Sequence, residues 1–234
     1  MKFNLLASAS TLAMGGFVSL ALPQAAQATL TCTAATFSCS ETVDLGSHLT
    51  NFSLSTTLDM FNPGFKQKLV SVVISEGGTI SSIGTIKNTG NSPATFKYSG
   101  GLNLTLGGGA GAPAAFPSFT STTNFANTTY TGVASGFTVN YNSSGPFAPV
   151  TTTLTGAALT GFVGNGTFNA LVGGFANNVL VLLGGNAAPT VATSGDPTVS
   201  ITYNYSVTVP EPASIALLGA GLTGIGVLRR RRKV

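Results

Sequence analysis

The feature that most constrains this chain is its last twenty-six residues, which combine three segments of different physical character. Pro210, Glu211 and Pro212 form an extended stretch, because a proline lacks the backbone N–H and disfavours helical geometry in the residue before it. Residues 213–228 carry no charge and partition into lipid, although a helix of this length reaches only about 24 Å against a bilayer core of about 30 Å. A basic cluster then follows, made of Arg229, Arg230, Arg231, Arg232 and Lys233. The sequence therefore predicts a short membrane-spanning segment whose basic end stays in the cytoplasm.

The order of these segments resembles the C-terminal sorting signal of PEP-CTERM proteins of Gram-negative bacteria. The resemblance rests on Val209-Pro210-Glu211-Pro212-Ala213-Ser214, on the short Gly-rich span and on the arginine run. It implies that a membrane protease-transpeptidase, the exosortase, recognises the Pro-Glu-Pro segment, removes the tail and sends the protein to the cell surface or exterior. An ordinary membrane anchor that keeps its tail is the alternative. Both interpretations place the body of the protein outside the cytoplasm.

Residues 1–28 have the pattern of a secretory signal peptide. Lys2 supplies the positive start, residues 5–22 are mostly apolar, and Ala26 and Ala28 form a small-x-small cleavage site. We expect signal peptidase to cleave after Ala28, and an uncleaved N-terminal helix is the alternative. The predicted organisation is a signal peptide (1–28), an exported domain (29–209) and a sorting signal (210–234) that passes through a transient membrane-inserted state.

The basic character of the chain belongs to its tails. The formal net charge is +4, yet six of the ten lysines and arginines are Lys2 and residues 229–233. Between Thr29 and Val209, four lysines stand against five acids. Nucleic-acid binding needs clustered cations and is therefore excluded. Charged residues make up 7% of the chain, far below the ~25% of typical soluble domains, which favours a surface of hydroxyls and amides.

Two cysteines, Cys32 and Cys39, follow the predicted cleavage site closely. In an exported protein such a pair favours a small disulfide loop that fixes the mature N-terminus. Metal binding would need more ligands, and His48 is the only histidine in the chain. Free reactive thiols are the remaining alternative.

The body of the chain has the pattern of short strands and turns. Val70, Val72 and Ile74 indicate a mostly buried strand, and Gly77-Gly78 is typical of a turn after it. Asn165-Gly166 predicts a type I′ hairpin between residues 162–163 and 167–168. The run from Val179 to Leu183 is apolar on both faces and is expected in the centre of a sheet.

The clearest alternation lies in the last strand, where Ile201, Tyr203, Tyr205, Val207 and Val209 face one way. The stretch between Thr29 and Val209 shows no amphipathic helix of useful length. We therefore predict an all-β fold with one antiparallel β-sandwich or jelly-roll-like domain. Its last strand runs directly into the sorting signal, so a folded domain could hang outside while its C-terminus remains in the membrane.

A second resemblance covers the body. Residues 58–63, 69–74 and 86–89, together with Tyr203-Asn204-Tyr205, are similar to the choice-of-anchor E domain, with Asn62 standing where that family usually has an acid. Membership would imply a surface location and sortase-type anchoring. It would supply no established activity.

Catalytic chemistry has few candidates in this chain. The acids and the histidine of the body are Glu41, Asp44, His48, Asp59, Glu76 and Asp196. The sequence contains no nucleophile elbow, zinc-binding helix or phosphate loop around them, so we expect no catalytic residues, no cofactor and no metal site. A calcium site built from Asp44, Asp59 or Asp196 with backbone carbonyls stays an open alternative.

Two functions remain open. The first is a structural or interaction protein of the cell surface or of an extracellular polysaccharide matrix, as in a biofilm, processed by signal peptidase and exosortase. The second is a carbohydrate-binding module that uses Tyr98, Tyr130 and Tyr141 as stacking platforms. The absence of tryptophan and the large number of phenylalanines favour the first.

Overall fold

The computed structural model describes residues 29–64 and 66–208, which form antiparallel β-sheets and one short helix. The strands are β1 (Thr31–Thr33), β2 (Ser38–Asp44), β3 (His48–Leu49), β4 (Phe52–Asp59), β5 (Gln67–Asn88), β6 (Ala94–Ser99), β7 (Gly101–Gly108), β8 (Phe119–Asn124), β9 (Thr128–Val133), β10 (Thr138–Thr155), β11 (Thr167–Ala176), β12 (Val179–Leu182) and β13 (Ala187–Val207). The helix is η1 (Gly156–Phe162), a 3-10 helix. The expected antiparallel all-β class is confirmed, whereas the jelly-roll-like topology stays a prediction. The predicted signal peptide and sorting signal lie outside the described residues.

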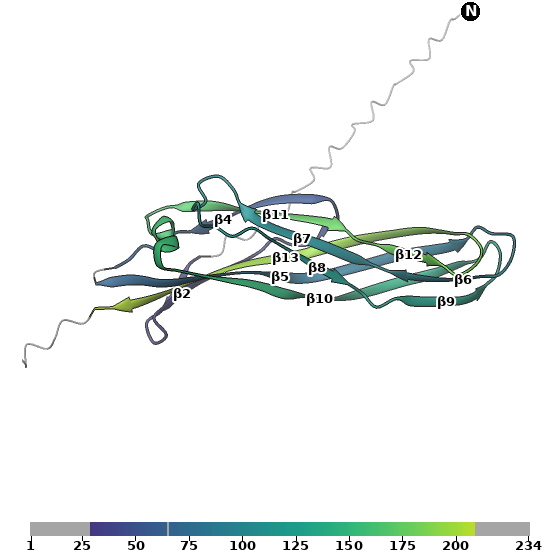
Figure 1. The fold of residues 1–234 in the computed structure, drawn as a ribbon, viewed down its shortest axis with the longest axis horizontal. Helices are drawn as coiled ribbons and strands as arrows, with labels where there is room; N and C mark the ends of the chain where they lie inside the picture. Colours follow the sequence, from purple (N-terminus) through teal and green to yellow (C-terminus); the bar gives the residue numbers. More distant parts are fainter. Residues whose placement is uncertain (1–28, 65, 209–234) are drawn as a thin grey trace, which may run out of the picture.

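One long sheet runs the length of the molecule, with β13 as its central strand (Figure 1). The strand order is β1-β2-β13-β5-β10, and β3 also pairs with β13. Strand β13 pairs with β5 from Ala187 opposite Asn88 to Val207 opposite Gln67. At about 3.3 Å per residue, β5 alone extends about 70 Å. The expected alternation in the last strand is confirmed for Ile201, Tyr203 and Tyr205, which are buried, whereas Val207 is 38% exposed. Val209 lies outside the described residues.

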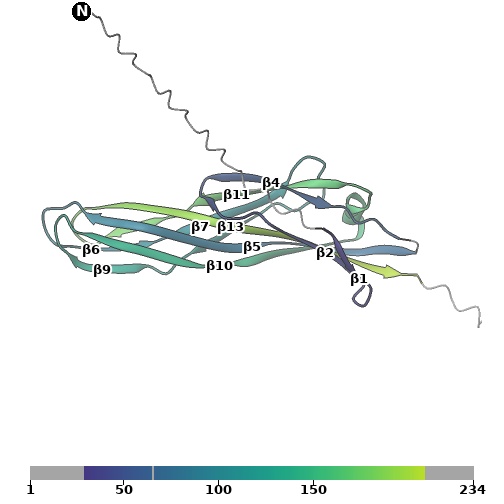
Figure 2. The ribbon, with the colours of Figure 1, turned by 180° about the vertical axis from the view of Figure 1, so that it is seen from behind.

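Two shorter sheets, β4-β11-β7-β8 and β12-β6-β9, cover one face of the long sheet (Figures 1 and 2). Their strands are continuous in sequence, because β7 follows β6 after Gly100, β9 follows β8 after residues 125–127, and β12 follows β11 after residues 177–178. All three breaks occur between the same two sheets. The strands of the covering layer are therefore interrupted at one level, whereas the long strands β5, β10 and β13 of the other layer continue past it.

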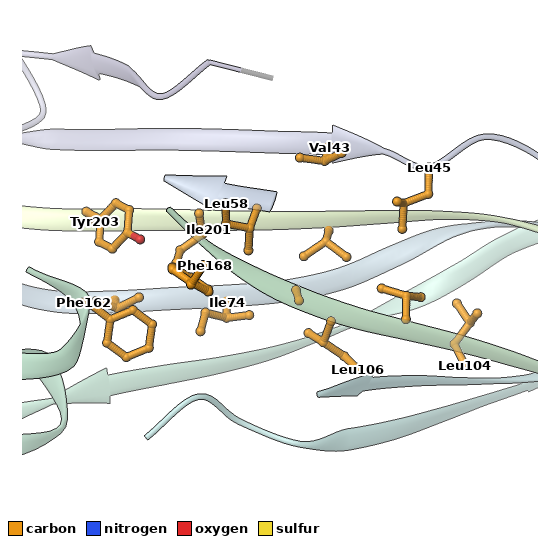
Figure 3. Close-up of a cluster of buried hydrophobic side chains, with 14 of the residues drawn as sticks. Val43, Leu45, Leu58, Ile74, Leu104, Leu106, Phe162, Phe168, Ile201 and Tyr203 are labelled. Atoms are coloured by element: carbon orange, nitrogen blue, oxygen red, sulfur yellow. The ribbon is translucent and has the colours of Figure 1, made fainter. Parts of the chain in front are cut away.

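Each short sheet closes its own hydrophobic core against the long sheet. The large core brings Ile74, Ile201 and Tyr203 of the long sheet against Leu58, Leu104, Leu106 and Phe168 of the four-stranded sheet, with Phe162 of η1 beside them (Figure 3). The small core lies under the three-stranded sheet. Its buried residues are Ile86, Ala94, Phe96, Tyr98, Val133 and Tyr141.

Where the two cores meet, four polar residues form what we call the polar belt: Ser82, Asn178, Thr193 and Tyr141, whose ring also belongs to the small core. The Thr193 hydroxyl donates to Asn178 Oδ1 at 3.0 Å and lies 2.9 Å from the Ser82 hydroxyl. Asn178 Oδ1 also accepts the N–H of Gly101, and the Tyr141 hydroxyl accepts the N–H of Gly100. The belt thus satisfies the backbone groups that the interruption of the covering layer exposes.

The expected turn at Gly77-Gly78 is wrong, because both glycines lie inside β5. Gly78 has φ of +133°, a conformation that residues with a side chain rarely adopt. A Cβ at this position would collide with the carbonyl oxygen of Asp196 on β13. Gly78 therefore permits a close approach of two paired strands, and the chain does not reverse here.

The hairpin expected at Asn165-Gly166 is also wrong. Phe162 ends η1, and Val163 forms an isolated parallel bridge with Phe61 instead of a hairpin strand. Leu159 and Phe162 stand three residues apart on the 3-10 helix, and both are buried. Burial of these two side chains prevails over the local turn preference.

The apolar run from Val179 to Leu183 was expected in the centre of a sheet, and this expectation is wrong. The run forms β12, at the edge of the three-stranded sheet. Val179, Val181 and Leu182 are each at least 40% exposed. In the first part of β5, Val72 and Ile74 are fully buried as expected, whereas Val70 is exposed. The exposure of Val70 follows from a bulge in β5. Leu69 pairs with Tyr205 and Ser71 pairs with Asn204, so Val70 between them has no partner on β13.

Candidate functional site

The end of β13 is the place where the folded domain meets the predicted sorting signal. Val207 pairs with Gln67, and the N–H of Thr208 donates to the carbonyl of Lys66 at 2.9 Å. Backbone pairing therefore continues to Thr208, two residues before Pro210. The sorting residues Pro210, Glu211 and Pro212, the cleavage-site residues Ala26 and Ala28, and the basic cluster 229–233 lie outside the described residues.

An apolar groove of about 590 Å³ borders this end. Leu69 and Val70 of β5 form one wall, and Leu159 of η1 with Val163 forms the other. Lys68 and Ser206 also line the groove, together with Gly156 and Thr160. The groove forms where β10 stops pairing with β5 at Thr155 and the chain turns away into η1.

Cys32 and Cys39 are joined by a disulfide, with their sulfurs 2.06 Å apart. They are directly opposite each other in the β1–β2 hairpin. The hairpin turn contains Phe37, which has φ of +49° and packs the edge of its ring against Tyr205. The disulfide therefore fixes a hairpin that contacts the last strand close to its end.

Glu41 and Asp59 lie next to each other, and Asp59 Oδ2 accepts the N–H of Leu30 near the start of the described chain. The N–H of Asp59 donates to Glu41 Oε2 at 2.9 Å, and the hydroxyl of Tyr203 donates to the carbonyl of Asp59 at 2.6 Å. Burial raises the pKa of Glu41, the Asp59 N–H opposes that rise, and the charge of Asp59 adds to it. Burial, with the nearby Glu41 and Asp59 charges, also raises the pKa of the Tyr203 phenol. These groups hold strands together and present no open pair of carboxylates.

The structure brings together Asp44, His48 and Asp196, three of the residues considered for catalysis or calcium binding. Burial and then the neighbouring Asp44 raise the pKa of Asp196, while His48 opposes the rise. Asp44 Oδ1 accepts the N–H of Gly46, and His48 Nε2 lies 2.8 Å from the carbonyl of Leu45. The His48 ring also packs against Phe52 at 5.7 Å. The histidine is thus engaged in local packing, and the cluster offers two adjacent carboxylates.

Glu76 is one of the acids considered for catalysis, and its burial was not predicted from the sequence. It lies on β5 between the sheets, it is 1% exposed, and neither carboxyl oxygen has a hydrogen-bond partner among the described residues. Burial raises its pKa to about 7; the Ser121 hydroxyl acts in the opposite direction, although it is not in hydrogen-bond geometry with either oxygen. The burial of Glu76 could have been predicted from the alternation of β5, because Glu76 faces the same side as Val72 and Ile74.

The tyrosines considered as sugar-stacking platforms are mostly internal. Tyr98 and Tyr141 are 2% and 1% exposed and pack against each other in the small core. Tyr130 is half-buried against Phe96, and its hydroxyl donates to the carbonyl of Asn140. The expectation that Tyr98 and Tyr141 form an exposed platform is therefore wrong, because their rings fill the space between the sheets.

Within residues 29–64 and 66–208, no three histidine, cysteine or acidic side chains gather as a metal site would require. The same residues contain no helix that is long and apolar enough to cross a bilayer.

Comparison with known proteins bears on the tail. Residues 208–233 match the PEP-CTERM protein-sorting motif. The tail carries a PEP-CTERM sorting motif. This motif implies an exported protein that an exosortase sorts to the cell surface. The choice-of-anchor E resemblance of the body stays a prediction.

No curated protein matches the chain significantly. Among solved structures, a chain from the structure of infectious bursal disease virus Gx strain matches with 13% identity and a TM-score of 0.15. The match covers 80% of this chain and 48% of the viral chain, so this chain spans about half of its length. A likeness at this level carries no argument about fold or function.

Proposed function

We propose that the chain is a non-enzymatic exported β-sandwich protein that an exosortase delivers to the cell surface or to an extracellular polysaccharide matrix. The observation that carries this proposal is the junction at Thr208. The sorting motif begins at residue 208, and the N–H of Thr208 is still hydrogen-bonded to the carbonyl of Lys66 on the neighbouring strand. The fold and the motif therefore adjoin with no linker between them.

In this function the two ends of the chain act in succession. Signal peptidase removes residues 1–28, residues 213–228 insert transiently in the inner membrane, and the basic cluster 229–233 stays in the cytoplasm. Exosortase then acts at Pro210-Glu211-Pro212 and frees the domain from its tail. The molecular role of the released domain is structural or interactive.

The outer face of the long sheet supports a matrix role. Thr42, Ser200, Ser75 and Thr151 stand in register across β2, β13, β5 and β10, so their hydroxyls form a row across the sheet. The Thr151 hydroxyl donates to Ser75 at 3.2 Å. Neighbouring strands are about 4.8 Å apart, so such rows present closely spaced hydroxyls to a hydrated polysaccharide without using net charge.

The first experiment is the intact mass and C-terminal peptide of the protein recovered from its native host. We expect a chain that starts at Thr29 and ends close to residues 210–212. Replacement of both Pro210 and Pro212 by alanine should leave the tail attached and the protein in the membrane fraction, whereas Pro117→Ala in a body loop should be processed normally. A native chain that retains residues 215–234 would overturn exosortase processing and leave a permanently anchored surface domain.

The matrix role is tested separately with secreted polysaccharide from the same host. We expect weak, non-saturating retention that falls when Thr42 and Thr151 are both changed to valine, and that is unaffected by Thr120→Val on the covering sheet. Saturable binding of one defined glycan would contradict a general matrix role and favour a carbohydrate-binding module.

A further inference from the structure

Exposed apolar side chains gather at the end of the molecule from which the C-terminus leaves. Phe37 is 50% exposed, Val70 51%, Val163 41% and Val207 38%. Strand pairing places them together, because Phe37 accepts the N–H of Tyr205 and Val70 follows Leu69, the partner of Tyr205. Val70 and Val163 also line the apolar groove beside η1. These exposed apolar side chains therefore lie on neighbouring segments at one end of the molecule, and we call them, with Lys68, the end surface.

The side chains of this surface are held in place. The ring of Phe37 packs against Tyr205 with centroids 6.1 Å apart, and the Cys32–Cys39 disulfide closes the hairpin that carries it. Val70 is the unpaired residue of β5 at the register shift opposite Asn204 and Tyr205. A fixed apolar surface costs little conformational entropy when it meets a partner.

The charge that faces outward at this end is positive. Lys68 lies on the rim of the groove and is exposed. The acids of this end are engaged elsewhere, since Glu41 is buried and accepts the N–H of Asp59, and Asp59 Oδ2 accepts the N–H of Leu30. Apolar groups with a lysine beside them fit a surface of anionic lipid headgroups.

The tether to the membrane is very short. Thr208 is still hydrogen-bonded to Lys66, and the membrane-spanning segment expected from the sequence begins at residue 213. Only residues 209–212 separate the two, and four extended residues span at most about 14 Å. While the tail is inserted, this end of the domain must lie next to the bilayer.

We propose that, before processing, the end surface formed by Phe37, Val70, Val163, Val207 and Lys68 rests directly on anionic phospholipid. The apolar side chains enter the boundary between headgroups and acyl chains, and Lys68 meets the phosphates. The proposal rests on the proposed function, because it requires the inserted intermediate. It also sets the orientation of the domain: the long strands rise from the membrane, and Phe137, at the start of β10, is held about 70 Å away.

The absence of tryptophan from the chain makes the test direct. Single-tryptophan variants Phe37→Trp and Phe137→Trp of the full chain are reconstituted in phosphatidylcholine–phosphatidylglycerol vesicles with brominated acyl chains. We expect at least a twofold quenching of fluorescence at residue 37 and none at residue 137, which is 67% exposed at the opposite end. Equal quenching at both positions, or none at residue 37, overturns the proposal.

A spacer separates binding from simple tethering. Ten glycine and serine residues inserted between Thr208 and Val209 should leave the quenching at residue 37 in place, because the surface itself binds lipid. Loss of quenching with the spacer shows that the tether alone held the domain near the bilayer, and overturns the proposal. Lys68→Glu should reduce the quenching of the spacer variant in anionic vesicles, whereas Lys87→Glu, at the other end of β5, should not.

Two further outcomes distinguish this proposal from its premise. A chain that alkaline carbonate extracts from the vesicles overturns the inserted intermediate, and with it both proposals. An inserted chain whose residue 37 is protected from aqueous iodide only when exosortase is present, without lipid quenching, assigns the surface to the enzyme and overturns this proposal alone.

Discussion

The two ends of the molecule share the same long strands but are stabilised differently. Toward the C-terminus, the large core packs several aromatic rings, including Phe61, Phe162, Phe168 and Tyr203, between the sheets. At the other end, the small core contains far fewer buried side chains, and a polar side chain, Asn88, ties its loops together. The polar belt separates them, and only β5, β10 and β13 pass it without interruption.

This difference predicts a hierarchy of stability along one domain. Burial of apolar surface is greater in the large core, so the part of the molecule next to the sorting motif should open last. The small core can lose its three-stranded sheet while the large core stays closed. The end next to the sorting motif would then stay folded when the opposite end fluctuates.

The largest expected effect is from Phe168→Ala. It removes a ring that is 1% exposed in the large core, so the free energy of unfolding should fall by about 3–5 kcal/mol in urea titrations. The matched change Phe96→Ala, in the small core, should mainly speed amide exchange in β6, β9 and β12. If Phe96→Ala speeds exchange equally in β4 and β11, the two cores open as one unit and the hierarchy is wrong.

Glu76 should make the stability of the domain depend on pH. Its pKa is about 7 in the folded chain and 4.5 ordinarily, so the unfolded chain loses the proton first as the pH rises. The free energy of unfolding is therefore highest below pH 4.5, falls by about 3 kcal/mol toward pH 7, and is level above it. Urea midpoints between pH 4 and 8 should show this fall in the natural chain and in Glu41→Gln, but not in Glu76→Gln. An unchanged slope in Glu76→Gln would assign the pH dependence to other groups.

Asn88 is expected to stabilise the loops at the end of the molecule that contains the small core. Its Nδ2 donates to the carbonyls of Ser92 and Val133, and its Oδ1 accepts the N–H of Gly90. Asn88→Ala leaves these groups unpaired, so the stability of this end should fall by about 2 kcal/mol, with faster exchange in the loops 89–93 and 134–137. Asn91→Ala, in the same loop but exposed, serves as the control and should change little.

The polar belt gives the smallest effect. Thr193→Val keeps the shape of the side chain but removes its bonds to Ser82 and Asn178, so we expect a loss of about 1 kcal/mol. Thr190→Val, which is exposed on the same strand, is the control. A double-mutant cycle with Ser82→Ala should show coupling between the two hydroxyls. If the two losses simply add, the belt does not act as one network.

Much of the fold follows from alternation in the sequence. Ile201, Tyr203 and Tyr205 were predicted to share one face because side chains alternate along a strand, and all three are buried on the core side. Gly77-Gly78 was misread, since a glycine pair serves equally for a turn and for the close approach of another backbone, and only the position of Asp196 decides between them. The run at Val179 could not be placed at an edge, because its own sequence does not specify which strands pair with it.

The candidate site also contains features that the sequence predicts and features that only the structure reveals. The sorting motif was predicted from the order of proline, span and arginine, and the match at residues 208–233 confirms it. The junction with the fold could not be predicted, because it depends on the register that places Thr208 against Lys66. The inward position of Glu76 was available from the alternation of β5, but a charged residue in that register contradicts the usual preference for apolar side chains.

The central position of β13 also has a mechanical consequence. The strand that leads to the C-terminus is paired with β5 over its whole length and with β2 over its last part. A force applied to the C-terminus along the strand axis therefore loads many backbone hydrogen bonds simultaneously in shear, instead of peeling them apart one by one. If the tail is held in the membrane as proposed, a force that flow exerts on the domain would act along the strand with the longest continuous pairing.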